Sequence, residues 1–298
     1  MARDILPGRM TLYELTDRSP LDAPVLIAAL EGWVDAGAAG TAAAEQIAEG
    51  GRTVATFDAD AIFDYRARRP TLDILDGRPT HLAWPTLRVV AARAGERDLL
   101  VLTGPEPDYR WRELADSMVA LVRELGVASW VSLGAIPAAV PHTRPVPVLA
   151  TASEDGLLPD GIRQGPDGRL TVPSAALSVF ELTVANAGIP AVGLFAQVPH
   201  YVSGAYPTAS IALLNALGRH LGVDFPVGQL ATRALERRGL LDAAAASDES
   251  TKAHVERLER IADESGLPAG DELIADIERF LRGTTDDDEG SDGGTRLH

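Results

Sequence analysis

Two of the six histidines follow apolar runs that predict strands, a position where side chains could take part in chemistry. His142 comes a few residues after the run Val127–Ile136, and His200 comes shortly after the run Pro190–Gln197. Tyr201 joins them as a candidate binding residue. Imidazoles at one sheet edge could bind Zn²⁺ or form an acid–base pair. The alternative is that both histidines are hydrogen-bonded and hold loops in place, which the absence of HExxH or another closely spaced ligand motif favours.

The turn after the first apolar run combines glycines with acids. Gly32, Gly37 and Gly40 follow Val25–Leu30 and precede an Ala-rich helix, an arrangement that could bind an anion at the helix N-terminus. Their spacing matches neither the dinucleotide fingerprint nor the Walker A motif, and no lysine follows them. Asp35 would repel a phosphate and suits the role of helix N-cap. We therefore interpret the segment as a structural strand-to-helix turn and keep Asp35 as a candidate binding residue.

A Pro-rich segment around Glu106 supplies two more candidates. Gly104–Pro107 follows the run Leu99–Thr103 and precedes a helix predicted over Tyr109–Leu125. Open α/β sheets place ligand sites at such strand ends. Glu106 could act as a general base, and Arg110 could bind a carboxylate. The alternative, which we favour, is that the prolines fix a turn; no serine in the chain occupies a GxSxG elbow.

The composition excludes several classes of site and partner. The 298 residues include no cysteine, so neither disulfides nor thiolate nucleophiles nor thiolate metal sites can form. The formal net charge of −16 argues against a nucleic-acid partner, because phosphate binding depends on Lys and Arg. No apolar run is long enough to span a membrane, and no secretory signal is apparent. We expect a cytoplasmic protein without cofactor or metal ion.

Apolar runs alternate with amphipathic stretches, a pattern typical of layered α/β folds. We predict a three-layer α/β/α sandwich with a mainly parallel central sheet. The predicted strands are Val25–Leu30, Thr53–Phe57, Leu87–Ala92, Leu99–Thr103, Val127–Ile136, Pro145–Ala152 and Pro190–Gln197. The predicted helices are an Ala-rich one ending near Glu49, then Tyr109–Leu125, Ser174–Asn186 and Pro207–Leu221. Segments 59–85 and 153–172 are interpreted as long loops or small excursions.

The chain divides by composition into an α/β domain at 1–226, a helical subdomain at 227–283 and a disordered acidic tail at 284–298. The helical subdomain is predicted to be an appendage to the sheet layers, with Ala243–Asp248 as a weak linker. Its predicted helices are Val227–Arg238, Asp248–Ser265 and Asp271–Arg282.

Four short segments occur in an order that is more specific than any one of them. They are Glu31–Gly37, Gly104–Pro107 ahead of Trp111, Leu133–Ala135 with Pro141–Pro145, and Val198–Tyr201 followed by Tyr206–Pro207. Together they resemble the actinobacterial branch of the PAC2 (proteasome-assembly-chaperone-like) family, from about residue 22 to 226. The resemblance implies a fold similar to that of phosphorylases and hydrolases, and a homo-oligomer, with a trimer ahead of other closed rings.

Relatives in archaea and eukaryotes assist 20S proteasome assembly, and some carry a hydrophobic-Tyr-any C-terminus that docks into the α-ring. This chain ends in Leu297-His298, which departs from that pattern. The resemblance implies no catalytic residues. We therefore hypothesise a non-enzymatic protein-interaction or assembly factor, with proteasome subunits as partners. The alternative hypothesis is a hydrolase- or phosphorylase-like enzyme that uses a strand-end cleft near Glu106, His142 and His200.

Overall fold

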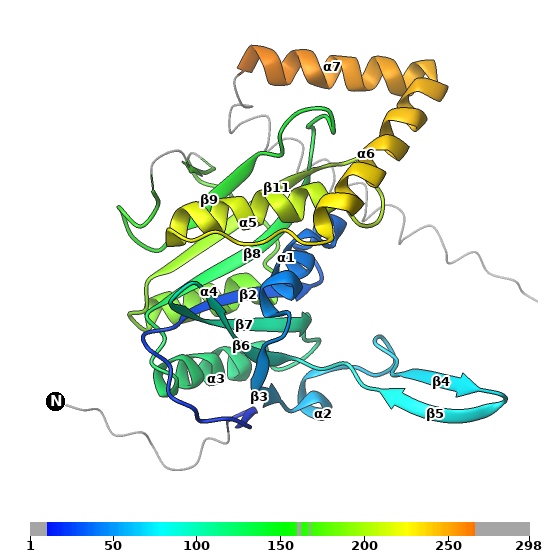
Figure 1. Cartoon of the computed structure of the whole chain (residues 1–298). Helices are drawn as coiled ribbons and strands as arrows, with labels where there is room; N and C mark the ends of the chain where they lie inside the picture. The colour runs from blue at the N-terminus through cyan, green and yellow to red at the C-terminus, as the bar shows by residue number, and fades with distance from the viewer. Residues whose placement is uncertain (1–10, 160–161, 167, 266–298) are drawn as a thin grey trace, which may run out of the picture.

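A mixed β-sheet lies at the centre of the protein (Figure 1). The computed structural model describes residues 11–159, 162–166 and 168–265. The strands of this sheet are β1 (Tyr13–Leu15), β2 (Val25–Glu31), β3 (Arg52–Phe57), β6 (Arg88–Ala94), β7 (Arg97–Pro105), β8 (Ser129–Ala138), β9 (Val148–Ala152), β10 (Arg163–Gln164) and β11 (Ala191–Pro199). Within the described residues they pair in the order β1-β3-β6-β7-β2-β8-β11-β9-β10.

The four central strands, β7, β2, β8 and β11, run parallel to one another. On one side β6, β3 and β1 continue the sheet as antiparallel strands, and on the other side β9 is antiparallel to β11. β2 buries Leu26 on one face and Ile27 on the other, as expected for a strand that is covered on both faces. The predicted α/β fold class, with parallel strands at its centre, is confirmed.

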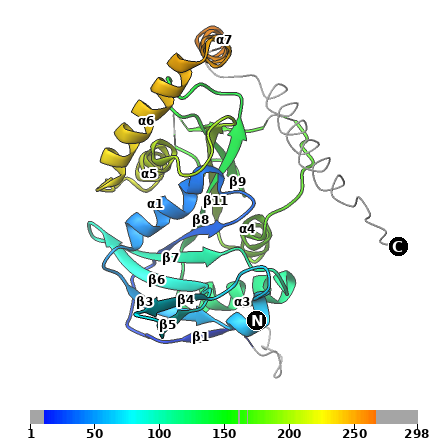
Figure 2. The ribbon, with the colours of Figure 1, turned by 90° about the vertical axis from the view of Figure 1, so that its right-hand side faces the viewer.

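Helices cover both faces of the sheet (Figure 2). They are α1 (Ala39–Ala48), α3 (Trp111–Glu124), α4 (Ala176–Asn186) and α5 (Pro207–Leu221). On one face α1 and α5 pack against apolar side chains that include Ile27 and Leu133. On the other face α3 and α4 pack against a cluster that includes Leu26 and Leu102. The helices and the sheet therefore form the three predicted layers.

A β-hairpin extends away from these layers (Figure 1). It consists of β4 (Thr71–Leu75) and β5 (Arg78–Ala83), which pair with each other and follow the short helix α2 (Ala59–Ile62). Asp76 and Gly77 have positive φ angles of 51° and 77°, the conformation of a type I′ hairpin turn. The segment interpreted as a long loop or excursion is thus partly a regular hairpin.

Two C-terminal helices follow the sheet layers: α6 (Leu230–Ser247) and α7 (Glu249–Ser265). The expected linker at Ala243–Asp248 is helical as far as Ser247, because its alanines favour helix. The break falls at Asp248, which is extended and accepts the Thr251 N–H at 2.7 Å to cap α7. The predicted helix 271–282 and tail 284–298 lie outside the described residues. Of the helices that are described, none is both long and apolar enough to cross a membrane.

Candidate functional site

Four of the sequence-predicted residues lie along one edge of the sheet. Asp35 follows β2, Glu106 follows β7, His142 follows β8 and His200 follows β11. Parallel neighbouring strands end at the same edge, so the four residues occur there in the spatial order Glu106, Asp35, His142, His200. Their side chains nevertheless enter different contacts.

Both ring nitrogens of the buried His142 have partners. Nδ1 lies 2.7 Å from the Tyr201 hydroxyl oxygen, and Nε2 lies 3.2 Å from Oδ1 of Asp242. The backbone N–H of His142 also donates to the Tyr201 hydroxyl oxygen at 2.8 Å. These contacts suit a neutral ring that accepts the Tyr201 proton at Nδ1 and donates from Nε2 to Asp242. Burial lowers the pKa of His142 although Asp242 opposes this effect, so the neutral form is favoured.

Tyr201 lies among three histidine rings. Its ring centroid is 5.8 Å from that of His142, 5.5 Å from that of His200 and 5.9 Å from that of His254. Burial raises the pKa of Tyr201 to about 12, so its hydroxyl stays protonated at neutral pH. His200 is exposed, and its Nδ1 lies 3.2 Å from the Ala138 carbonyl oxygen. We call these four side chains, together with Asp242, the histidine group.

A hydrogen bond from α6 and ion pairs with α7 hold these two helices at the sheet edge. Arg238 on α6 donates to the His142 carbonyl oxygen at 3.0 Å. Arg144, shortly after β8, pairs with Asp263 at 2.7 Å and with Glu259 at 3.2 Å, both on α7. The histidine group therefore lies between the sheet edge and the two C-terminal helices.

Asp35 is not the N-cap residue of α1, which is Ala38, but its carboxylate accepts N–H groups of the first turn of α1 across the short turn η1 (Ala36–Ala38). Its Oδ1 accepts the N–H groups of Gly40 at 2.7 Å and Thr41 at 3.2 Å, and its Oδ2 accepts the Thr41 hydroxyl at 2.5 Å. Burial raises the pKa of Asp35, whereas these hydrogen bonds act in the opposite direction. The carboxylate is thus used to begin a helix.

Replacing Asp35 by alanine should lower the free energy of unfolding by about 1–2 kcal/mol, because Gly40 and Thr41 lose their acceptor. Asp35→Asn keeps one side-chain oxygen as an acceptor and should lose clearly less. Urea unfolding of the two variants measures both effects. Equal losses in the alanine and asparagine variants would contradict the capping role.

Glu106 joins two loops through its carboxylate. Oε2 accepts the Trp33 N–H at 3.1 Å, and Oε1 accepts the N–H of Ala176, the first residue of α4, at 2.7 Å. A Cβ atom at Gly32 would lie 2.5 Å from Oε2, so a glycine at that position leaves room for the carboxylate. These contacts give Glu106 a positioning role for the β2–α1 loop and for α4.

Arg110 lies apart from these groups. It is exposed, precedes α3 in the left-handed region at φ 59°, and forms an ion pair with Glu113 one turn further on. Of the predicted candidates, the structure therefore brings together His142, His200 and Tyr201, and it separates Asp35, Glu106 and Arg110 from them. Among the residues that the structure describes, no group of three or more His, Asp or Glu side chains could hold a metal ion.

Sequence reasoning missed Asp242 and His254 in the histidine group. A weak signal existed in both helices. Asp242 is four residues after Arg238 and pairs with it at 2.8 Å, and His254 is four residues before the buried Leu258 on the same face of α7. Neither signal indicates which part of the sheet the helices contact.

Comparison with known proteins places this geometry in a family. The PAC2 family model matches residues 29–245. A Mycobacterium tuberculosis protein of unknown function superposes with a TM-score of 0.78 and 34% identity, covering 88% of this chain and 92% of that one. A proteasome-assembly chaperone homologue from the same organism has a TM-score of 0.70 and 35% identity, covering 78% of this chain and 99% of that one.

The fold is also shared more distantly. An archaeal proteasome activator from Pyrococcus furiosus has a TM-score of 0.64 at 18% identity, covering 80% of this chain and 99% of that one. No curated protein matches the sequence. Because the family model matches well over half of this chain, the chain belongs to the PAC2 family.

Proposed function

We propose that this chain is a non-enzymatic protein-interaction or assembly factor. The observation that carries the proposal is the β4–β5 hairpin, which extends from the body (Figure 1). All the side chains of its two strands are exposed, the apolar ones included. Ile74 and Leu75 are 63% and 67% exposed, and Leu72 pairs across the hairpin with the likewise exposed Leu82. Contiguous exposed apolar side chains mark contact surfaces.

The structure of the hairpin supports a partner-binding role. A two-stranded hairpin has little stability in water by itself and gains it by packing on another surface. At its base Tyr65 packs edge-on against Trp84, with ring centroids 4.7 Å apart, so the hairpin leaves the body at a defined place. A partner that covers the leucine and isoleucine side chains would bury apolar area and stabilise the hairpin.

The contacts at the sheet edge favour this proposal over an enzyme with a strand-end cleft. Both carboxylate oxygens of Glu106 accept backbone N–H groups, and both ring nitrogens of His142 have protein partners. Such groups hold loops and helices in place. The His142–Asp242 contact and the pairs of Arg144 with α7 hold α6 and α7 at the sheet edge. We propose that they belong to a helical appendage at 227–283, attached to an α/β domain at 1–226.

The partners that we propose are proteasome subunits and further copies of this chain, arranged as a closed homo-oligomer with a trimer favoured, in the cytoplasm. The support for the proteasome is that a relative of 35% identity is described as a proteasome-assembly chaperone homologue. The support for self-association is the exposed apolar hairpin.

Serine substitutions at Leu72, Ile74 and Leu82 together should abolish partner binding and leave folding intact, because these side chains are exposed. We expect the free energy of unfolding to change by less than about 1 kcal/mol. The tagged chain is isolated from its native cell, and the proteasome subunits that copurify with it are quantified. The variant should recover at least about tenfold less of them than the wild type. Light scattering reports self-association separately.

The matched control replaces Leu235 and Leu240 on α6 by serine, which removes exposed apolar side chains at a different place. If the hairpin variant keeps both its oligomeric mass and its captured partners, the proposal is wrong. Loss of proteasome subunits with an unchanged oligomeric mass would mean that the hairpin binds the proteasome. A lower oligomeric mass with unchanged recovery of proteasome subunits would mean that the hairpin forms the contact between copies of this chain.

A further inference from the structure

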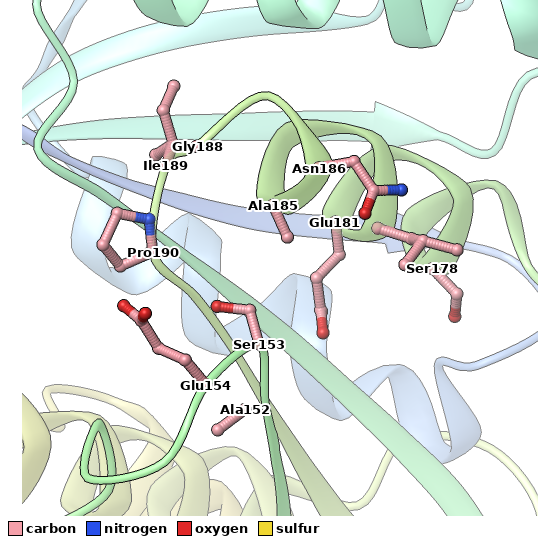
Figure 3. Close-up of a pocket in the computed structure, with 11 residues that line it drawn as sticks. Ala152, Ser153, Glu154, Ser178, Glu181, Ala185, Asn186, Gly188, Ile189 and Pro190 are labelled. Atoms are coloured by element: carbon pink, nitrogen blue, oxygen red, sulfur yellow. The ribbon is translucent and has the colours of Figure 1, made fainter.

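A pocket of about 320 Å³ lies beside the C-terminal half of α4 (Figure 3). Its walls come from α4, from the turn that leads into β11, and from the residues that follow β9. Because Pro190 precedes β11 and His200 follows it, the pocket and the histidine group are at opposite ends of this strand. The volume is at the lower end of the range for small-molecule sites, about 300–1,000 Å³.

The carboxylate of Glu181 is held in this pocket by hydroxyl groups of the sheet. The Thr151 hydroxyl on β9 donates to Oε1 at 3.3 Å, and the Ser132 hydroxyl on β8 is a second hydrogen-bond partner. The fully buried Ser132 in turn accepts the Trp130 indole N–H at 2.8 Å. Two hydroxyl donors use about half of the acceptor positions of a carboxylate.

Because Gly193 has no side chain, the Thr151 hydroxyl and the Glu181 carboxylate have room to lie close together beside it. A Cβ atom at this position of β11 would lie 2.5 Å from the Thr151 hydroxyl oxygen and 3.1 Å from Oε2 of Glu181. A side chain there would displace the hydroxyl or the carboxylate. The polar floor of the pocket thus depends on residues from three adjacent strands as well as on α4.

The charges around the pocket all have the same sign. Glu154 contributes a second carboxylate, and the described lining residues include no Lys, Arg or His. The C-terminal turn of α4, with Ala185 and Asn186, brings the negative end of a helix dipole to the same wall. Leu182, by contrast, adds an apolar wall. A ligand that complements this surface carries a positive charge on a short apolar stem.

We propose that this pocket binds a small organic cation, an alkylguanidinium or alkylammonium group, which donates hydrogen bonds to Glu181. The cation belongs either to a free small molecule or to the arginine or lysine side chain of a partner protein. A metal ion is disfavoured because no set of three ligands exists among the described residues. Burial raises the pKa of Glu181, so binding should strengthen as the pH rises and the carboxylate ionises. The inference is independent of the proposed function, since it concerns neither the hairpin nor the histidine group.

Calorimetric titration of the full chain with n-butylguanidinium tests the proposal, and n-butylurea serves as an uncharged ligand of the same shape. We expect the guanidinium to bind at least about tenfold more tightly than the urea. Glu181→Gln, which keeps the size and the acceptor oxygen, should lower the guanidinium affinity at least about tenfold. Glu256→Gln, on the exposed face of α7, is the matched control and should bind as the wild type does.

N-acetylarginine N-methylamide distinguishes the two sources of the cation. Binding as tight as that of butylguanidinium supports an arginine side chain of a partner, and binding of butylguanidinium alone supports a free small molecule. Equal affinity for the urea, no binding of the guanidinium at about 10 mM, or unchanged affinity in Glu181→Gln would overturn the proposal. If Glu181→Gln does not fold, Glu154→Gln and the rise in wild-type affinity between about pH 5 and 7 decide the matter.

Discussion

Replacing Gly104 by alanine should lower the free energy of unfolding by at least about 3 kcal/mol. Gly104 has a φ angle of 146°, where residues with a side chain are rare. An added Cβ would lie 2.3 Å from the Thr86 carbonyl oxygen and 2.9 Å from the Leu87 Cα, both of which are backbone atoms of the two residues that precede β6. The hairpin of β6 and β7 would have to separate, and Glu106 would lose its position.

The matched control is Gly126→Ala. Gly126 also has a positive φ angle, 66°, but no atom of a residue beyond its two chain neighbours lies within 4 Å of the position that its Cβ would occupy. The alanine there has only the left-handed backbone penalty of about 1–2 kcal/mol. Urea unfolding of both variants separates the steric contribution from the backbone one. If both variants lost the same free energy of unfolding, the close approach of Gly104 to Thr86 and Leu87 would not contribute to the loss of stability.

Replacing His142 by alanine should lower the free energy of unfolding by about 1–3 kcal/mol, whereas His200→Ala should change it by less than about 0.5 kcal/mol. The His142 ring is buried, and its loss removes the side-chain partner of the Tyr201 hydroxyl and one partner of Asp242, which keeps its pair with Arg238. The His200 ring is exposed; it has edge-on ring contacts with Tyr201 and His254 and a polar contact with the Ala138 carbonyl oxygen. The two histidines thus form a matched pair at neighbouring strand ends.

The loss of unfolding free energy in His142→Ala should also depend on pH. Burial lowers the pKa of His142 below its ordinary value of 6.5, so the unfolded chain takes up a proton first as the pH falls. The wild type therefore loses stability between about pH 7 and the lowered pKa, and the alanine variant lacks this contribution. We expect the difference between the two proteins to be largest near pH 8 and smaller near pH 5.5.

Other histidines do not obscure this comparison. Burial also lowers the pKa values of His220 and His254, but both residues are present in the wild type and in the variant, so their contributions largely cancel. Chemical unfolding at several pH values measures the trend. A deficit that grows as the pH falls would mean that the His142 ring is charged in the folded protein and that its assignment as neutral is wrong.

Much of the sheet could be predicted from short stretches of sequence. The apolar runs that became β2, β8 and β11 and the stripe that became α5 have a local signature, because burial on one or two faces imposes a periodicity on the residues themselves. The β4–β5 hairpin lacked such a signature. Its residues are exposed on both faces, so neither strand has the alternation that a half-buried strand shows, and the Asp76-Gly77 turn was its main signal.

The candidate site divides in the same way. From the sequence alone it followed that Asp35, Glu106, His142 and His200 come after strands, since each position depends on a few neighbouring residues. Only the tertiary structure decided that His142 contacts Asp242, which is 100 residues away along the chain. That contact depends on where α6 and α7 pack. The sequence of a helix shows which of its faces is apolar, but it does not show which surface that face will pack against.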